Sequence, residues 1–527
     1  MTREMLYDAI TEVKDDLIME AIETKPAKSK VHWLKFGSIA AAFAVVAGLG
    51  AGVLSGKIPW LHIGGNAAGA GADGSMVFDA YAGPVFPLTT VKGGDGLTAE
   101  RAITYDFEGW MAGDPDRPYY GLPVTDSYTL TNPTGEDKTV TLLYPFAGTL
   151  FDLRHRPTLT ADGAELQTTL LTGQYSQLAV GRPGGLPSLN SPDSWEEYRA
   201  LLSGGRYQAG ALEEWPDLSH IPVTVYEITN PWVEPGVGNK GDGNYNPNIH
   251  AEMELDYGET TVLSYGFNSG KFDQDSGRMR QGFHVPQPPA EGSSTDPGFY
   301  GKERAQPHYL LVIGEPLDSF RLVGVSTGGP ESTDYLEWGM DIRADLRQYE
   351  TDLDSALRTV AERSYGATDW NHYGSMADDP DFELYFGMMK DCLLDAGLLL
   401  DSPAERYDLH WLEDLEVWAY TRVFYLEAEV TIPAGASVTV EARMLKEASY
   451  NHACHSKRDR DLYGYDLVTK LGTNLDFTSQ TARAVNTDGV EIVRQNFGFD
   501  WENGVDTVTL DPAVEHYYLE VRRVKTK

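Results

Sequence analysis

The sequence predicts a mainly β fold with α insertions: an N-terminal cytoplasmic helix, one transmembrane helix and an ectodomain of β-sandwich-like domains. Three observations predict it. Residues 36–56 lack charged side chains, and residues 64–75 are almost wholly small residues within a flexible linker assigned to 57–75. The remainder alternates Thr-, Val- and Tyr-rich runs with turns of Gly, Pro, Asn and Asp. Two Cys in 527 residues exclude a disulfide scaffold.

Residues 1–35 are expected to form a cytoplasmic amphipathic helix and a basic linker. Between residues 3 and 24, apolar side chains recur every three or four positions, and Pro26 ends the run. The resulting apolar face consists of Leu6, Ile10, Val13 and Leu17. Because so short a segment has no core of its own, we expect this face to bind a cytosolic protein or a second copy of itself. The alternative is a marginal helix that only leads into the anchor.

The stretch from Phe36 to Gly56 is the expected transmembrane helix. Its 21 uncharged residues span about 30 Å as an α-helix, which is the thickness of the hydrocarbon core of a bilayer. The long segment before it favours a retained anchor over a cleaved signal. Lysines precede the span without acids among them, and Lys57 is followed by a long stretch without bases. We therefore expect a single-pass protein of the cell membrane with a cytoplasmic N-terminus and an extracytoplasmic C-terminal ectodomain.

Within the span, Gly48, Gly52 and Gly56 recur at four-residue spacing. On a helix this spacing makes a groove where a second backbone can approach, so it predicts self-association of the helix. The alternative is that a span so rich in Gly and Ala contains such patterns by chance.

The N-terminal layout resembles that of a known group of proteins. The segments Leu6-Tyr7-Asp8-Ala9-Ile10 and Asp15-Asp16-Leu17-Ile18-Met19-Glu20-Ala21, a Lys-rich linker and a single span are similar to the N-termini of uncharacterised single-span membrane proteins of Gram-positive anaerobes. Some proteins of this layout resemble transmembrane anti-sigma factors. The resemblance implies a cytoplasmic segment that holds a sigma factor and an outer domain that senses the envelope.

Charge is distributed unevenly along the chain. The formal net charge is −37, and residues 1–57 contain seven bases and seven acids, so residues 58–527 carry the whole excess of acid. Such a surface repels nucleic acid and anionic headgroups, so no nucleic-acid partner is expected. Cations or basic polymers would be attracted to it instead.

Residues 76–335 are expected to form a β-sandwich-like ectodomain with short helical insertions. Asp126–Thr131 and Thr139–Tyr144 are strand-like runs joined by a turn, and Asp162-Gly163 marks a hairpin. Further strands are predicted over residues 223–228, 250–257, 261–267, 308–313 and 320–325.

Residues 336–415 are expected to be helical and residues 416–527 to return to a β-sandwich-like region. Apolar residues at 342, 346, 349, 353, 357 and 360 fall at helical spacing, as do those at 384, 388, 392 and 393. In the last region a turn over 433–436 separates two Thr/Val-rich runs, a pattern common where two sheets pack face to face.

One predicted strand carries the candidate ligand-binding residues. Strand alternation places His250, Glu252, Glu254 and Asp256 on one face and Ala251, Met253 and Leu255 on the other. A row of carboxylates suits calcium or a basic ligand, and the alternative is a solvated face. Trp110, in a Gly/Pro/Asp-rich loop, is a candidate for stacking on a sugar, and the alternative is that it fills the core.

Metal binding rests on weaker patterns. Asp242, Asn244 and Asn246 begin like a calcium loop, but Pro247 occupies the place of the required Gly. Calcium is left open, and no other cofactor is expected. Residues 452–455, His-Ala-Cys-His, offer ligands for zinc, and the alternative is a surface loop. A disulfide between Cys392 and Cys454 is also left open.

Gly324-Val325-Ser326-Thr327-Gly328 matches the nucleophile elbow of hydrolases. A loop follows it instead of a helix, and the chain lacks the strand–helix alternation of an α/β sheet. We therefore expect a protein that is not an enzyme, with a binding or sensing ectodomain at the cell envelope. The alternatives are an anti-sigma-like transmembrane regulator and an envelope hydrolase that uses Ser326.

Overall fold

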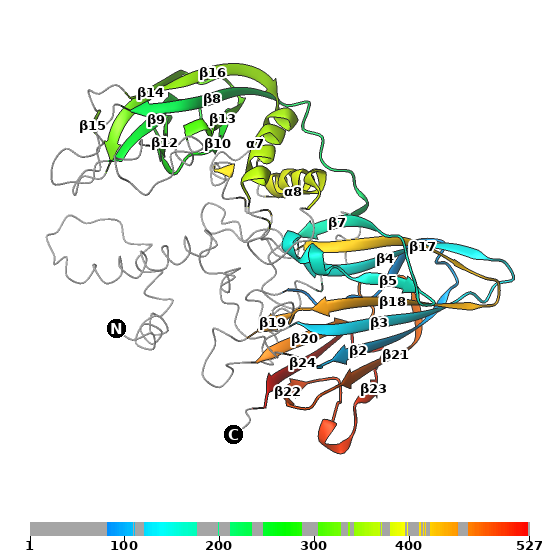
Figure 1. Ribbon diagram of the computed structural model, residues 1–527. Helices are drawn as coiled ribbons and strands as arrows, with labels where there is room; N and C mark the ends of the chain where they lie inside the picture. The colour runs from blue at the N-terminus through cyan, green and yellow to red at the C-terminus, as the bar shows by residue number, and fades with distance from the viewer. Residues whose placement is uncertain are drawn as a thin grey trace. The chain divides into compact units, whose positions relative to one another are not determined.

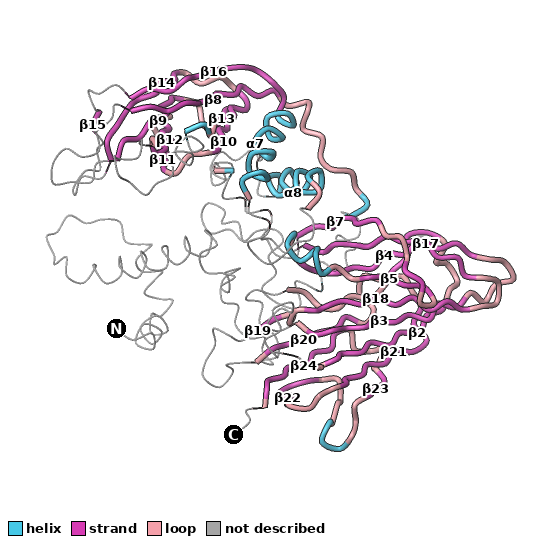
Figure 2. The backbone as a smooth tube through the Cα atoms, in the orientation of Figure 1, coloured by secondary structure: helices cyan, strands magenta, loops and turns pink. Residues whose placement is uncertain are grey.

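The computed structural model confirms a mainly β protein (Figures 1 and 2). The structure describes residues 82–108, 110, 121–175, 199, 211–233, 246–273, 275–286, 304–327, 336–337, 342–368, 370, 380–395, 398, 411–412, 415, 417, 422–451 and 462–524. Within this part of the chain, no helix has the length and apolar character needed to cross a membrane. The predicted span at 36–56 and the predicted helix at 3–24 lie outside the described residues.

The first sandwich is built from both ends of the described chain, and we call it the split sandwich. One of its layers contains seven described strands in the order β23-β21-β2-β3-β18-β5-β6. Their bounds are Thr507–Thr509 (β23), Asp476–Val485 (β21), Thr98–Asp106 (β2), Leu122–Thr131 (β3), Ser437–Lys446 (β18), Thr158–Ala161 (β5) and Ala164–Glu165 (β6). Its described pairs are antiparallel except β2 with β21, which is parallel.

Two smaller sheets pack on the inner face of this layer. Their described strand orders are β1-β4-β17-β7 and β19-β20-β24-β22. The bounds are Thr89–Lys92 (β1), Lys138–Gly148 (β4), Arg422–Ile432 (β17), Thr169–Tyr175 (β7), Tyr450–Asn451 (β19), Tyr463–Val468 (β20), His516–Arg523 (β24) and Val490–Gln495 (β22). Val140 of β4 shares a buried cluster with Val440 of β18, and Leu519 of β24 shares one with Ile103 of β2. Alternate apolar side chains of the strands therefore point inward and fill the space between the layers.

The chain between β7 and β17 contains a second sandwich with helices on one side, which we call the inserted sandwich. Its described sheets have the orders β10-β13-β8-β16 and β11-β12-β9-β14-β15. The bounds are Pro222–Val233 (β8), Asn246–Glu254 (β9), Thr260–Tyr265 (β10), Ser269–Asp273 (β11), Arg278–His284 (β12), His308–Gly314 (β13), Ser319–Thr327 (β14), Leu336–Glu337 (β15), Ile342–Asp352 (β16), Leu353–Ala367 (α7) and Phe382–Asp395 (α8).

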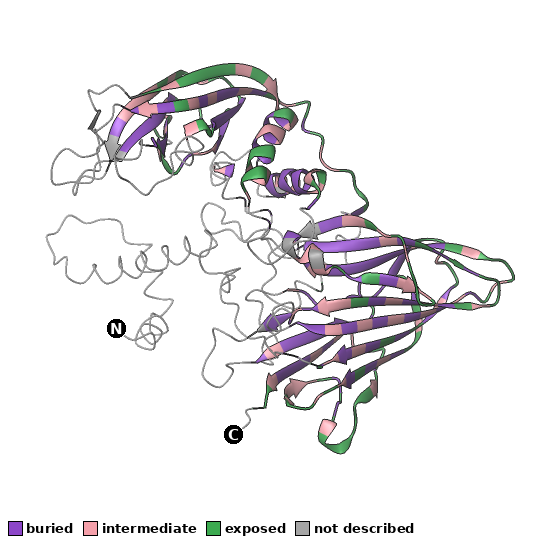
Figure 3. Ribbon diagram, in the orientation of Figure 1, coloured by how far each residue is buried: buried purple, intermediate pink, exposed green. Residues whose placement is uncertain are grey.

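Alternation along β13 explains these layers. Leu310 and Val312 belong to the cluster between the two sheets, whereas Leu311 and Ile313 belong to the cluster that contains the buried residues of α7 and α8. The sheet that contains β13 is therefore apolar on both faces, and Figure 3 shows the matching burial of α8. Asp352 caps α7 by accepting a hydrogen bond from the Ser355 N–H at 2.8 Å.

The sheets group the chain differently from the expected regions 76–335 and 416–527. β17 pairs with β4 and β7, and β18 pairs with β3 and β5, so strands from both regions form one sandwich. The expected helix from residue 342 is wrong for its first half. Ile342–Asp352 is strand β16, whose extended pairing with β8 overrides the helical spacing of its apolar residues. The second predicted helix is confirmed as α8.

Two predicted turns have different roles. Asp162 and Gly163 have φ of 48° and 82° and close the β5–β6 hairpin, as predicted. The turn after β3 instead carries the chain from one layer to the other, as does the turn after β17. These crossovers are bonded together, because Asn132 N donates to Ala436 O at 2.9 Å and Gly435 N donates to Thr134 O at 3.0 Å.

Candidate functional site

The predicted ligand-binding strand is β9, in the middle of the five-stranded sheet of the inserted sandwich (Figure 2). Ala251 and Met253 are buried between the two sheets, so the predicted alternation is confirmed for β9. Glu252 and Glu254 lie on the opposite side, which we call the outer face. β9 ends at Glu254, and Asp256 lies in the following turn, where its Oδ1 accepts the Gly258 N–H at 2.8 Å. The extension of the row to Asp256 is therefore wrong.

Strand register places basic residues beside these carboxylates. Glu254 faces Arg278 of β12, and Glu252 lies between Arg280 of β12 and Arg321 of β14. Lys271 of β11 pairs with Arg280, so it extends the same row. Sequence analysis missed these four bases because they come from three other strands. The local signal was Arg278-Met279-Arg280, where the buried Met279 alternates with two bases.

The carboxylates of the outer face form ion pairs with these arginines. Glu254 Oε1 lies 3.1 Å from Arg278 Nε, and Glu252 Oε2 lies 2.6 Å from Arg321 Nη2. The two arginine side chains are 71% and 61% exposed, so both remain accessible to a ligand. In the described part of the chain, no cluster of three or more His, Cys, Asp and Glu side chains is arranged to hold a metal ion.

His250 lies at the covered end of the outer face and is only 5% exposed. Burial, and next the positive charge of Arg280, lower the pKa of His250 to about 4, against a smaller raising effect of Glu252. His250 is therefore neutral at neutral pH. A Cβ atom added to Gly282 would lie 2.5 Å from Ser269 Oγ and 2.7 Å from His250 Cδ2. The side chains of Ser269 and His250 therefore pack directly against this glycine and leave no room for a larger residue.

Trp110 does not lie on the surface. It is 5% exposed, its Nε1 donates to Tyr465 Oη at 2.8 Å, and its ring packs edge-to-face against Phe107 and Tyr463. The prediction that Trp110 stacks on a sugar is therefore wrong, because the core of the split sandwich encloses its ring. The composition of its loop gave no sign of these long-range neighbours.

Ser326 lies inside strand β14, where it pairs with Pro247 of β9 and Leu336 of β15. A nucleophile elbow requires a sharp turn between a strand and a helix, and Gly324–Thr327 forms continuous strand instead. The elbow interpretation of this motif is wrong in its geometry.

Several predicted residues lie outside the described part of the structure. These are Leu6, Ile10, Val13, Leu17, Gly48, Gly52, Gly56, Asp242, Asn244, His452, Cys454 and His455. Asn246 begins β9, but its side chain is not described. Cys392 is buried in α8, whereas Cys454, with which a disulfide was left open, lies outside the described residues.

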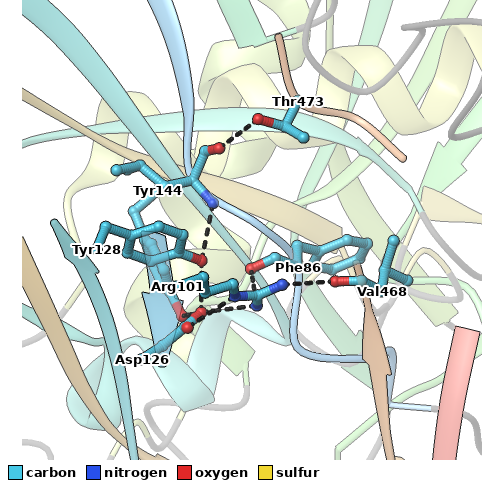
Figure 4. Close-up of polar contacts among 8 residues, drawn as sticks. Phe86, Arg101, Asp126, Tyr128, Tyr144, Val468 and Thr473 are labelled. Atoms are coloured by element: carbon cyan, nitrogen blue, oxygen red, sulfur yellow. Dashed lines mark hydrogen bonds and ion pairs between the residues drawn. The ribbon is translucent and has the colours of Figure 1, made fainter. Parts of the chain in front are cut away.

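A buried ion pair in the split sandwich was also missed by sequence analysis (Figure 4). Arg101 of β2 donates from Nε and Nη2 to the two carboxylate oxygens of Asp126 on β3, each at 2.8 Å. Arg101 Nη1 also donates to the carbonyl of Val468 at 2.7 Å, and Tyr128 Oη donates to Asp126 at 2.6 Å. Tyr128 Oη in turn accepts the Leu88 N–H at 3.0 Å.

This network joins all three sheets of the split sandwich. β2 and β3 belong to the seven-stranded layer, Val468 belongs to β20, and Leu88 leads into β1. The side chains of Arg101 and Asp126 are 1% and 0% exposed, so the ion pair is out of reach of a ligand. We assign it a structural role, and the accessible outer face of the inserted sandwich is the candidate binding site.

Comparisons with known proteins do not assign this chain to a family. A scan against protein-family models finds no match, and a search of curated proteins finds none.

Proposed function

We propose that this chain is a single-pass membrane-anchored protein with a non-catalytic binding or sensing ectodomain outside the cytoplasm. The observation that carries the proposal is the order of the segments. A basic linker, 21 uncharged residues and a Gly/Ala-rich tether precede the mainly β body. The tether gives a body of this kind freedom to meet partners at the membrane surface.

Binding is favoured over catalysis by the outer face of the inserted sandwich and by the position of Ser326. The outer face of the inserted sandwich presents exposed charged side chains on a rigid sheet, an arrangement suited to recognition. The hydrolase alternative relies on Ser326, which lies in a paired strand. The outer face therefore serves as a binding surface in this proposal, without a reaction at Ser326.

Membrane placement is tested on intact cells with a different tag at each end of the chain. Protease added outside should remove the C-terminal tag and spare the N-terminal tag until the cells are lysed. Val45→Arg with Leu49→Arg should move the chain to the soluble fraction, because each central charge opposes insertion by about 3 kcal/mol. Val45→Ile with Leu49→Ile is the matched control. Recovery of the full-length wild type in the soluble fraction would contradict the proposal.

A regulatory role is the second candidate, and it is favoured by the apolar spacing of Leu6, Ile10, Val13 and Leu17. Ile10→Asp with Val13→Asp should release a co-purifying cytosolic protein, because both changes place charge on the apolar face. Glu12→Lys alters only the polar face and should retain the partner. Failure of the wild type to retain any cytosolic protein under gentle conditions would count against regulation.

A further inference from the structure

We infer that the outer face of the inserted sandwich binds a polyanion of the cell envelope, a polymer with repeating phosphate or carboxylate groups. This inference rests on the proposed function, which places the face outside the membrane. It names the ligand class of the ectodomain, and it reverses the sequence expectation that the Glu252 row attracts calcium or a basic ligand.

Local charge on the outer face differs from that of the chain as a whole. By register, its strands carry four bases and four acids. The bases are Lys271, Arg278, Arg280 and Arg321, and the acids are Glu252, Glu254, Asp273 and Glu337. The whole chain has 42 Lys and Arg against 79 Asp and Glu. The outer face therefore has about twice the proportion of bases to acids found in the whole chain, and it repels an anion less than the rest of the acidic surface does.

The bases of the outer face are spread over three strands. Lys271, Arg280 and Arg321 lie in one row across β11, β12 and β14, with Glu252 of β9 between the two arginines. Neighbouring strands are about 4.8 Å apart, so the row is about 14 Å long. Arg278 lies two residues from Arg280 on the same strand, about 7 Å away. The cations are thus arranged in two dimensions on a rigid sheet, and an extended polymer can meet several at once.

The ion pairs of the outer face leave the arginines accessible. Arg278 contacts Glu254 through Nε, and its side chain is 71% exposed, so most of it faces water. Arg321 contacts Glu252 through Nη2 and is 61% exposed. A guanidinium carries five N–H donors in a planar fork that matches phosphate and carboxylate oxygens. The glutamates therefore position the arginines, and they also keep the affinity for anions moderate.

The test uses the full-length chain in nanodiscs of zwitterionic lipid, with polyphosphate and polygalacturonate as separate probes. The wild type should bind at least one of them, and the preferred probe identifies the anionic group. Lys271→Gln, Arg278→Gln and Arg321→Gln together should weaken binding about tenfold or more at 50 mM salt. The control is Lys92→Gln, Arg347→Gln and Arg443→Gln, which removes the same charges from exposed positions elsewhere. It should change the affinity by less than about threefold.

Glu252→Gln gives the sharpest result, because it removes an acid from the row of bases. A polyanion site predicts tighter binding of the same probe, whereas a cation site predicts that calcium binding is lost. The inference is overturned if the wild type binds neither polymer, if the control weakens binding as much as the outer-face variant, or if Glu252→Gln weakens binding. Membrane placement is measured separately on cells, so a correctly anchored chain that binds neither polymer overturns only this inference.

Discussion

Arginine–carboxylate pairs occur in both sandwiches at similar distances, yet they serve different purposes. In the split sandwich, Arg101 Nη2 lies 2.8 Å from Asp126 Oδ2, and both side chains are buried. In the inserted sandwich, Arg321 Nη2 lies 2.6 Å from Glu252 Oε2, and the arginine is 61% exposed. The distance between the charges therefore does not reveal their role. Burial does, because a buried charge that loses its partner is far more costly than an exposed one.

The buried pair is tolerated because both of its members make further hydrogen bonds. Arg101 donates to Asp126 and to the Val468 carbonyl, and Asp126 also accepts from Tyr128. Burial by itself would lower the pKa of Arg101, but the charge and hydrogen bond of Asp126 together with the nearby Tyr128 and Tyr144 outweigh this effect, and the pKa is raised. Arg101 is therefore charged, and the network links the three sheets.

The largest expected effect breaks this buried pair. Arg101→Met should reduce the free energy of unfolding by about 3–5 kcal/mol, because it leaves the buried Asp126 carboxylate without its partner. Arg101→Met with Asp126→Leu should be less damaging than the single change, since no lone charge remains. Denaturant unfolding of the two variants measures the difference. A loss below about 1 kcal/mol for Arg101→Met would show that the pair is not a structural link.

The inserted sandwich also buries a titratable group, His308, whose cost can be compared with that of the buried ion pair. His308 is buried, stacks on Phe283 with ring centroids 3.6 Å apart, and donates from Nδ1 to the Gly266 carbonyl at 2.6 Å. Burial lowers the pKa of His308 to about 4, although the Gly266 hydrogen bond opposes the shift. The unfolded chain binds a proton near pH 6.5 and the folded chain near pH 4, so stability is complete above pH 6.5 and falls as the pH drops toward 4.

Between pH 7 and pH 5, His308 should therefore cost the fold about 2 kcal/mol. His308→Gln retains an N–H donor for Gly266 and should remove this part of the pH dependence. The measurement is the free energy of unfolding of both proteins at the two pH values. His250, whose pKa is also about 4, contributes a similar loss to both and so serves as the internal reference. An identical pH dependence in the variant would contradict a neutral buried His308.

The sequence predicted strands well where their residues alternate or form a short apolar run. β9 was recognised because an apolar face against a core imposes a period of two, and β13 was recognised as a short run of apolar residues, which is typical of a strand buried on both faces. β16 was not recognised, since Leu346 and Tyr349 are spaced as on a helix and only pairing with β8 fixes them as strand. The split sandwich was not predicted as one unit, because β17 and β4 are far apart in the sequence and no local pattern names a strand's partner.

The candidate site followed the same rule. Glu252 and Glu254 were placed correctly on one face, since this needs only the alternation of β9. The arginines that change the meaning of that face come from β12 and β14, whose register with β9 is a long-range property. The prediction for Trp110 was wrong for the same reason, because Tyr465, which accepts the hydrogen bond of its indole N–H, lies 355 positions away in the sequence. The pattern within a segment thus predicts which face of a sheet a residue lies on, but it does not predict which residues of other strands lie beside it.

The smallest expected effect concerns the exposed pair of Arg278 and Glu254. Both side chains are largely in water, at 71% and 47% exposure, so the attraction across 3.1 Å is strongly screened. In a double-mutant cycle with Arg278→Ala and Glu254→Ala, the coupling energy should be about 0.5 kcal/mol or less, and it should shrink further in 1 M salt. The same cycle on Arg101 and Asp126 should give a coupling several times larger with little response to salt, because the core excludes ions. Equal coupling in the two cycles would mean that burial does not separate the structural pair from the surface pair, and the assignment of the outer face to ligand binding would lose its physical basis.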